Sequence, residues 1–211
     1  MIGYTSAIPN RSCLKILNRS WRLLLSPASV RSVTKKNRHI LFQRGYAIDN
    51  GAYAWFNKDM DFQDDKFLAL CDEYYKEADW IVIPDYVGDW WETARMFMLW
   101  YPRLIKYRKK LMFVAQDGIE QNNYATIKGM TSNGVGIFVG GSTEWKINNG
   151  RNIAKICKDN NELCHIGRVN TAKRLKLCFD WGATSFDGSG MSRFSQTAVI
   201  MNREMCQGRL F

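Results

Sequence analysis

Short apolar runs alternate along the chain with longer stretches in which apolar residues recur at helical spacing. The short runs predict strands at 1–5, 21–25, 46–49, 80–84, 111–115, 136–140, 164–168 and 184–187. The amphipathic stretches predict helices at about 64–78, 89–107, 120–131, 148–160 and 171–181. This alternation is typical of repeated β-α units that build a parallel sheet.

Eight such units predict an α/β fold, a (β/α)₈ barrel in one domain over 1–211 that includes the basic N-terminal segment 1–45. The chain of 211 residues is shorter than the roughly 250 residues typical of this barrel, so we expect short loops or one incomplete unit. A doubly wound open sheet is the alternative. No G-x-G-x-x-G follows a predicted strand and no Walker A motif occurs, which argues against a dinucleotide or NTP site.

Polar residues and glycines follow the predicted strands, among them Asp49, Asp85, Gln116 and Asp187. The carboxyl ends of parallel barrel strands share one mouth, so we expect these carboxylates to meet in one cavity. Separated carboxylates suit glycosidic chemistry, because one can attack the anomeric carbon while another moves protons. The sequence therefore predicts a candidate glycosidic site at the carboxyl ends of the strands.

Charge and composition narrow the classes of partner. The net charge is +10, and residues 1–50 hold nine basic side chains against one acidic one, which favours a polyanionic partner. No apolar run is long enough to span a membrane and no signal sequence opens the chain, so we expect a soluble, intracellular protein. The six cysteines lack paired C-x-x-C spacing and there are two histidines, so a structural zinc site is not expected.

Five motifs follow one another in the chain: Asp49-Asn-Gly-Ala-Tyr53, Pro84-Asp85-Tyr86, Val114-Ala-Gln116-Asp-Gly118, Val139-Gly140-Gly141-Ser142 and Ser185-Phe-Asp187-Gly-Ser-Gly190. In this order they resemble the active-site motifs of tRNA-guanine transglycosylases. They are more similar still to the small DpdA-type deazapurine DNA-modification proteins of phages and bacteria. The segment His165-Ile-Gly-Arg-Val-Asn170 adds to this resemblance. The match spans roughly residues 46–194, and its strength lies in the order of the motifs.

The resemblance implies a role for each motif. Asp187 would be the nucleophile that attacks C1′ of the sugar, and Asp49 would be the general acid and base. Asp85 would accept hydrogen bonds from the N1 and N2 edge of a guanine-like base, while Gln116 and the backbone N–H groups of two glycines would face its O6. The implied base-binding residues are Asp85, Gln116, Gly140, Gly141 and Tyr53.

Two departures from the tRNA enzymes qualify the resemblance. The zinc-binding C-x-C-x-x-C…H segment after the nucleophile is missing, so zinc and a tRNA-specific accessory domain are not predicted. No other cofactor is expected. Asn50-Gly-Ala follows Asp49 where the tRNA enzymes have Ser-Gly-Gly, which changes the expected shape of the base pocket.

The expected partner is DNA with a flipped nucleobase, because a base inside a duplex cannot reach such a pocket. A free 7-deazaguanine base is a second expected ligand. The protein would act in the cytoplasm of a bacterial or phage-infected cell. The candidate DNA-binding residues are Arg168, Arg193, Lys109, Lys110, Lys35 and Lys36.

The sequence thus predicts an enzyme that cleaves the base–deoxyribose bond, with exchange of guanine for a 7-deazaguanine as the favoured outcome. A hydrolytic glycosylase that excises a modified base from phage DNA is the near alternative. Two alternatives come from other functional classes. One is a non-catalytic barrel that binds nucleic acid, and the other is an enzyme that acts on a small glycoside or phosphosugar.

Overall fold

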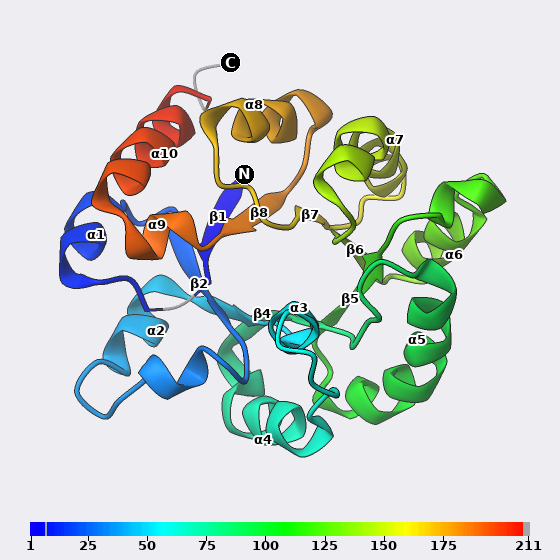
Figure 1. Ribbon diagram of the computed structural model, residues 1–211, viewed down its shortest axis with the longest axis horizontal. Coiled ribbons are helices and arrows are strands. Elements are labelled where there is room, and N and C mark those ends of the chain that lie inside the picture. The colour runs from blue at the N-terminus through cyan, green and yellow to red at the C-terminus, as the bar shows by residue number, and fades with distance from the viewer. Residues whose placement is uncertain (7, 209–211) are drawn as a thin grey trace.

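Eight parallel strands pair in chain order, and β8 pairs with β1 to close the barrel (Figure 1). The structure is a computed structural model that describes residues 1–6 and 8–208. Its strands are β1 (Ile2–Thr5), β2 (Trp21–Leu25), β3 (Tyr46–Ile48), β4 (Ala78–Val82), β5 (Lys110–Ala115), β6 (Gly136–Val139), β7 (Cys164–Ile166) and β8 (Ser185–Gly188). The predicted (β/α)₈ fold is confirmed, while residues 209–211 of the predicted domain lie outside the described residues.

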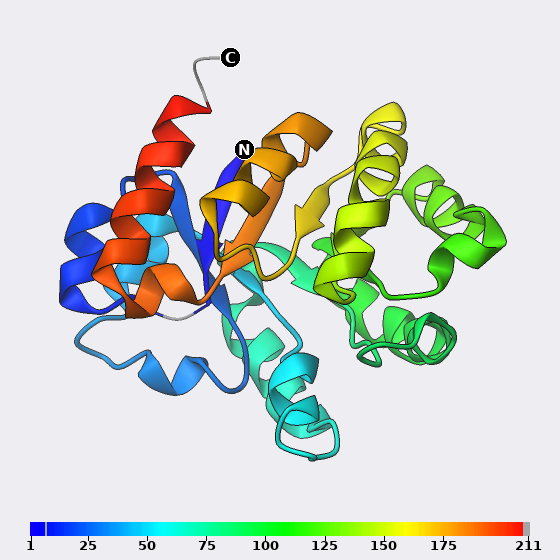
Figure 2. The ribbon, with the colours of Figure 1, turned by 45° about the horizontal axis from the view of Figure 1, so that its top comes forward.

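Helices surround the barrel on all sides (Figure 2). They are α1 (Arg11–Ile16), α2 (His39–Arg44), α3 (Ala52–Phe56), α4 (Asp64–Tyr74), α5 (Trp90–Leu104), α6 (Ala125–Ser132), α7 (Thr143–Asp159), α8 (Ala172–Trp181), α9 (Gly190–Arg193) and α10 (Ser195–Gln207). Short 3₁₀ turns lie at η1 (Val30–Ser32), η2 (Tyr75–Glu77), η3 (Ile105–Tyr107) and η4 (Ile119–Asn122). Across the described residues, no helix combines the length and apolar character that crossing a membrane requires.

Element boundaries differ from the predictions for local reasons. α7 begins at Thr143, five residues before the predicted start, because the Ser142 side chain caps it by accepting from the backbone N–H of Trp145 at 3.3 Å. β7 stops at Ile166 rather than 168, since Arg168 adopts a left-handed backbone with φ 60° that cannot continue a strand. The helices α1, α2, α3, α9 and α10 were not predicted, and four of them have six residues or fewer.

Two layers of core follow from the alternation of side chains along each strand. Inside the barrel pack Tyr4, Leu24, Ala47, Trp80, Val82, Met112 and Val114. The opposite faces of the strands pack against the helices in two larger apolar clusters. Apolar side chains therefore fill the centre of the barrel interior.

Part of the basic N-terminal segment serves the fold. The Arg22 guanidinium pairs with Asp79 at the start of β4. Arg44 donates four hydrogen bonds of 3.0–3.3 Å to the backbone carbonyls of Leu14, Leu17, Asn18 and Trp21. These two cations hold the first units of the barrel together. Fewer basic side chains of segment 1–45 are therefore free to bind a polyanion than its net charge suggests.

Candidate functional site

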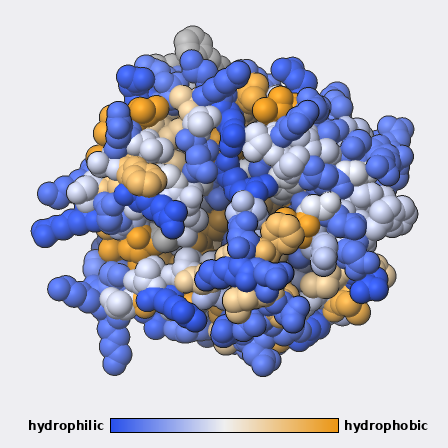
Figure 3. All heavy atoms as spheres, in the orientation of Figure 1, coloured by the Kyte–Doolittle hydropathy of each residue, from blue (hydrophilic) through white to orange (hydrophobic). Residues whose placement is uncertain are grey.

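A cavity of about 1030 Å³ opens at the carboxyl ends of the strands. Figure 3 shows this face of the molecule, where hydrophilic side chains gather around the centre. The sequence-predicted residues that line the cavity are Asp49, Tyr53, Asp85, Gln116, Gly140, Arg168, Asp187 and Arg193. Residues from strands far apart in the chain therefore meet as the barrel topology requires.

Asp187 lies near the end of β8 and is 6% exposed. Its Oδ1 accepts a hydrogen bond from the backbone N–H of Arg168 at 3.0 Å and lies 3.3 Å from Nε2 of His165. Among the described residues both contacts fall on Oδ1, so Oδ2 is the oxygen left for a ligand. One oxygen of the Asp187 carboxylate is therefore held by two neighbours, and the other is not held by a described donor.

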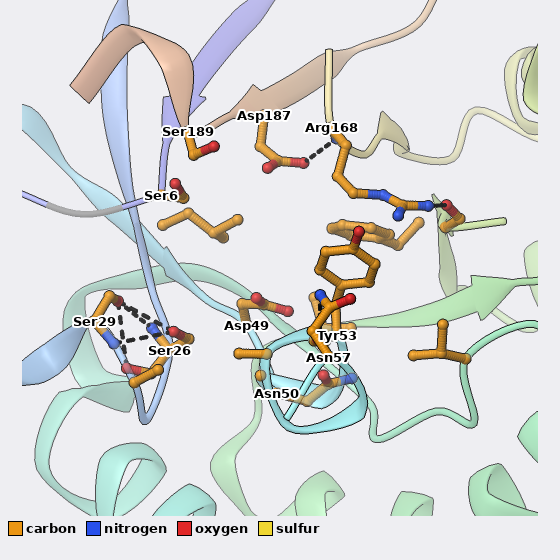
Figure 4. A pocket seen from close by; sticks show the side chains of 18 of the residues that line it. Ser6, Ser26, Ser29, Asp49, Asn50, Tyr53, Asn57, Arg168, Asp187 and Ser189 are labelled. Carbon is orange, nitrogen blue, oxygen red and sulfur yellow. Dashed lines mark hydrogen bonds between the residues drawn. The ribbon is translucent and has the colours of Figure 1, made fainter. Parts of the chain in front are cut away.

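Asp49 follows β3 and faces Asp187 across the cavity (Figure 4). Burial raises the pKa of the Asp49 carboxyl to about 7, and the negative charges of Asp187 and Asp85 act in the same direction. The backbone N–H groups of Gly51 and Asn50 oppose this shift. Asp49 therefore carries its proton for a substantial fraction of the time at neutral pH, as a general acid requires.

Asp85 lies between two amide side chains. Its Oδ1 accepts from Nδ2 of Asn50 at 2.7 Å, and its Oδ2 accepts from Nε2 of Gln116 at 2.6 Å. Burial raises the pKa of Asp85, against the effect of these two hydrogen bonds. The Gln116 Oε1 accepts from the backbone N–H of Gly88 at 3.2 Å, so both ends of the amide are engaged. Gln116 thus orients Asp85, rather than presenting its amide freely to a base as the resemblance implied.

The expected role of Gly140 and Gly141 is corrected by the structure. The backbone N–H groups of both residues donate to the carbonyl of Ala115, at 2.9 and 3.3 Å. Their carbonyls accept from the Arg168 guanidinium. Gly141 is also packed against Trp145, where an added Cβ would lie 2.3 Å from a ring carbon. Neither amide is therefore free to meet the O6 of a base.

Arg168 reaches the cavity, but its side chain is held inside the site. The guanidinium lies 4.3 Å from the centroid of the Tyr53 ring while it donates to the two glycine carbonyls. Tyr53 is 47% exposed and lines the cavity next to Asn57 in Figure 4. Arg168 therefore braces Tyr53 and the end of β6, and it differs from a free surface cation of the kind that phosphate binding needs.

The other predicted DNA-binding residues fall on opposite sides of the barrel. Arg193 is exposed at the rim of the cavity, and Lys35 and Lys36 are exposed in the segment that leaves the carboxyl end of β2. Lys109 and Lys110 lie at the amino end of β5, away from the mouth, and Lys110 pairs with Glu162 at 2.9 Å. The prediction that these two lysines contact DNA bound at the cavity is therefore corrected.

Three polar residues near the site were not assigned a role from the sequence. They are His165, Ser185 and Lys146. Lys146 is 4% exposed and donates to the carbonyls of Gly140 and Gly167 at 3.2 and 2.8 Å. No local sequence signal separates this lysine from the solvent-facing lysines of α7, because its burial depends on the neighbouring strand ends.

Replacing Lys146 should change how stability depends on pH. Burial lowers the pKa of Lys146 to about 7, with the charge of Arg168 acting the same way. Between about pH 7 and pH 10 the unfolded chain binds the additional proton, so stability of the wild type rises relative to Lys146→Met as pH increases. The slope approaches at most about 1.4 kcal/mol per pH unit. Urea unfolding of both proteins across this pH range measures the free energy of unfolding. Parallel plots of that free energy against pH for the two proteins would contradict the expectation.

No metal site emerges from the residues that the structure describes, where no group of three or more His, Cys, Asp or Glu side chains is placed to hold an ion.

Comparison with known proteins identifies the fold. No family model and no curated protein matches the chain. Dihydrodipicolinate synthase from Bacillus clausii matches with a TM-score of 0.59 at 10% sequence identity, over 100% of this chain and 75% of that chain. Tryptophan synthase from M. tuberculosis matches with a TM-score of 0.55 at 10% identity, over 98% of this chain and 90% of that chain. Both names denote enzymes, and at this identity the likeness shows the barrel fold alone.

Proposed function

We propose that this barrel is an enzyme that cleaves the N-glycosidic bond between a nucleobase and deoxyribose in DNA, through a covalent intermediate on Asp187. The observation that carries the proposal is the pair Asp49 and Asp187 in one cavity with unlike environments. Glycosidic cleavage requires one carboxyl group that donates a proton and one carboxylate that attacks the sugar. A carboxyl with a raised pKa suits the first role, and a carboxylate oriented by hydrogen bonds suits the second.

The first half-reaction uses both carboxyl groups. Oδ2 of Asp187 attacks C1′ and forms an ester bond as the bond from C1′ to the base nitrogen breaks. The departing base takes the electron pair of that bond, and the proton of Asp49 neutralises it. The products are a sugar ester of Asp187, a free base and an ionised Asp49.

The second half-reaction regenerates the enzyme. The Asp49 carboxylate removes a proton from the incoming nucleophile, which attacks C1′ and releases the Asp187 carboxylate. A 7-deazaguanine base as nucleophile gives exchange, and water gives an abasic strand. Exchange is the outcome that the motif resemblance favours, with Asp85 as the carboxylate that faces the N1 and N2 edge of the base.

DNA as the partner is supported by cations around the mouth. Arg193 lines the rim, and Lys58, Lys35 and Lys36 are exposed at the same end of the barrel. A base must leave the duplex to reach Asp187, which costs a few kcal/mol that phosphate contacts offset. Tyr53 presents an exposed ring in the cavity on which a flipped base can stack.

The Arg193→Ala substitution should weaken DNA binding in a salt-dependent manner. We expect affinity to fall several-fold at low salt, and the slope of log affinity against log salt to decrease in magnitude by about one. Fluorescence anisotropy at several salt concentrations measures both quantities. Lys109→Ala is the matched control, because Lys109 lies at the opposite end of the barrel and its removal should leave both unchanged. Equal effects of the two substitutions would contradict a DNA site at the mouth.

Mass spectrometry of DNA tests the proposed reaction directly. Single- and double-stranded oligonucleotides, unmodified and phage-modified, are incubated with the protein with and without a free 7-deazaguanine base. A mass shift of the strand that requires the added base establishes exchange, whereas a released base and an abasic strand establish hydrolysis. DNA that binds without either change supports a non-catalytic barrel, and activity on a free nucleoside alone supports a small-molecule enzyme.

A further inference from the structure

Three buried side chains form a continuous hydrogen-bonded chain behind the cavity. Ser185 Oγ lies 2.9 Å from His165 Nδ1, and His165 Nε2 lies 3.3 Å from Asp187 Oδ1. Adjacent strands explain the arrangement, because the β7–β8 register pairs His165 with Ser185, and Asp187 lies two residues further along the same face of β8. His165 is 0% exposed and Ser185 is 4% exposed.

The partners of the imidazole determine which nitrogen carries its proton. An ionised Asp187 can accept hydrogen bonds and cannot donate one, so the proton of a neutral His165 must lie on Nε2. Nδ1 is then an acceptor, and Ser185 donates its hydroxyl proton to it. This assignment gives the Ser185 hydroxyl and both ring nitrogens of His165 a hydrogen-bond partner, and among the described residues it leaves Asp187 Oδ2 without one.

The surroundings of His165 favour the neutral form of the imidazole. Aromatic rings of Tyr4, Trp80 and Phe138 lie 4.6–5.7 Å from it, centroid to centroid. Burial lowers the pKa of His165, the charge of Lys146 acts the same way, and the hydrogen bond and charge of Asp187 oppose them. A neutral donor can orient the carboxylate without cancelling the negative charge that makes it a nucleophile.

Ser185 is unsuited to be a nucleophile itself, although serine, histidine and aspartate occur together in hydrolases. Asp187 lines the cavity, whereas Ser185 lies beneath it in the barrel interior. The series of hydrogen bonds therefore ends at the Asp187 carboxylate, on the side of the cavity.

We propose that His165 is a positioning residue for Asp187. Its Nε2–H and the backbone N–H of Arg168 hold Oδ1 between them and leave Oδ2 directed at the substrate, while Ser185 selects the required tautomer. The proposal rests on the proposed function, because it concerns the nucleophile of that reaction.

Nuclear magnetic resonance tests the geometry without any substrate. The protein labelled with ¹⁵N at histidine contains two imidazoles, and His39, exposed on α2, is the internal reference. We expect the His165 resonances to report a proton on Nε2 and none on Nδ1 at neutral and mildly alkaline pH, above the ordinary histidine pKa of 6.5. A proton on Nδ1 alone, or a charged ring in this range, would overturn the proposal.

Two substitutions of similar polarity then test the effect on the reaction. In His165→Gln the amide nitrogen can reach the place of Nε2, whereas in His165→Asn it reaches the place of Nδ1 and falls short of Asp187. We expect single-turnover base release to fall about 10–100-fold in His165→Asn and to stay within about threefold of wild type in His165→Gln, with DNA affinity unchanged in both. Equal rates in the two variants, both folded by circular dichroism, would contradict the positioning role.

The two measurements separate failure of this proposal from failure of the proposed function. If no DNA or nucleoside substrate is turned over by the wild type, the function fails while the ¹⁵N spectra still decide the tautomer and charge of His165. If the wild type releases a base and the His165→Asn variant does so equally fast, the function stands and the positioning role is overturned.

Discussion

The Asp187→Asn substitution should lower base release from DNA by at least about a thousandfold while DNA affinity stays within about twofold of wild type. The amide has nearly the shape of the carboxylate, and its Oδ1 can still accept from the Arg168 backbone N–H and from His165. What is lost is the negative oxygen that attacks C1′. The variant should therefore fold and bind, and fail at the formation of the sugar ester.

Single-turnover assays and intact-protein mass spectrometry measure this outcome. Wild type quenched during turnover should carry a DNA adduct that maps to the peptide containing Asp187, and the variant should carry none. Asp59→Asn is the matched control, since it makes the same chemical change at an exposed residue whose left-handed backbone asparagine tolerates. Turnover that persists in Asp187→Asn would reject the covalent mechanism.

The Asp49→Asn substitution should lower the rate of base release by about a hundredfold or more, and it should remove the pH dependence of the first half-reaction. The acid form of Asp49 is the reactive one. Because burial raises the pKa of Asp49 to about 7, the wild-type rate should fall about tenfold per pH unit above that value. The Asn variant should show a low rate that is flat across the same range.

Stability supplies an independent check on Asp49. Its pKa is raised in the folded protein above the ordinary value of 3.8, so its contribution to stability is present at acidic pH and is lost as pH rises towards about 7. The Asp49→Asn variant avoids this loss and should unfold at a higher temperature than wild type at pH 8. A variant less stable than wild type at pH 8 would show that the ionised Asp49 does not destabilise the folded protein.

The sequence determined the fold class and the carboxylates of the candidate site. Short apolar runs and the helical stretches between them set the number and order of strands, and a parallel barrel brings the carboxyl ends of all strands to one mouth. Asp49, Asp85 and Asp187 each follow or end a strand, so their convergence on one cavity could be predicted without coordinates. Short helices such as α3 escaped prediction because a helix of five residues has no visible amphipathic period.

Which atoms are free for a ligand was decided by the tertiary structure. Gly140 and Gly141 were expected to offer their N–H groups to a base, and the carbonyl of Ala115 on the neighbouring strand takes both. Lys110 was grouped with the DNA-binding cations, and the direction of β5 places it at the far end of the barrel. Hydrogen-bond partners and strand direction relate residues distant in the chain, so local sequence cannot assign them.

The environment of the Asp187 carboxylate likewise depends on contacts across strands. His165 and Ser185 meet because β7 and β8 pair in one register, and Lys146 is buried because the ends of β6 and β7 close over it. In the sequence these are an ordinary histidine, serine and lysine. The sequence thus determined which residues lie at the mouth of the barrel. Packing between strands determined their protonation, their orientation and which atoms they contact, because pKa and hydrogen-bond geometry depend on the surroundings of a group.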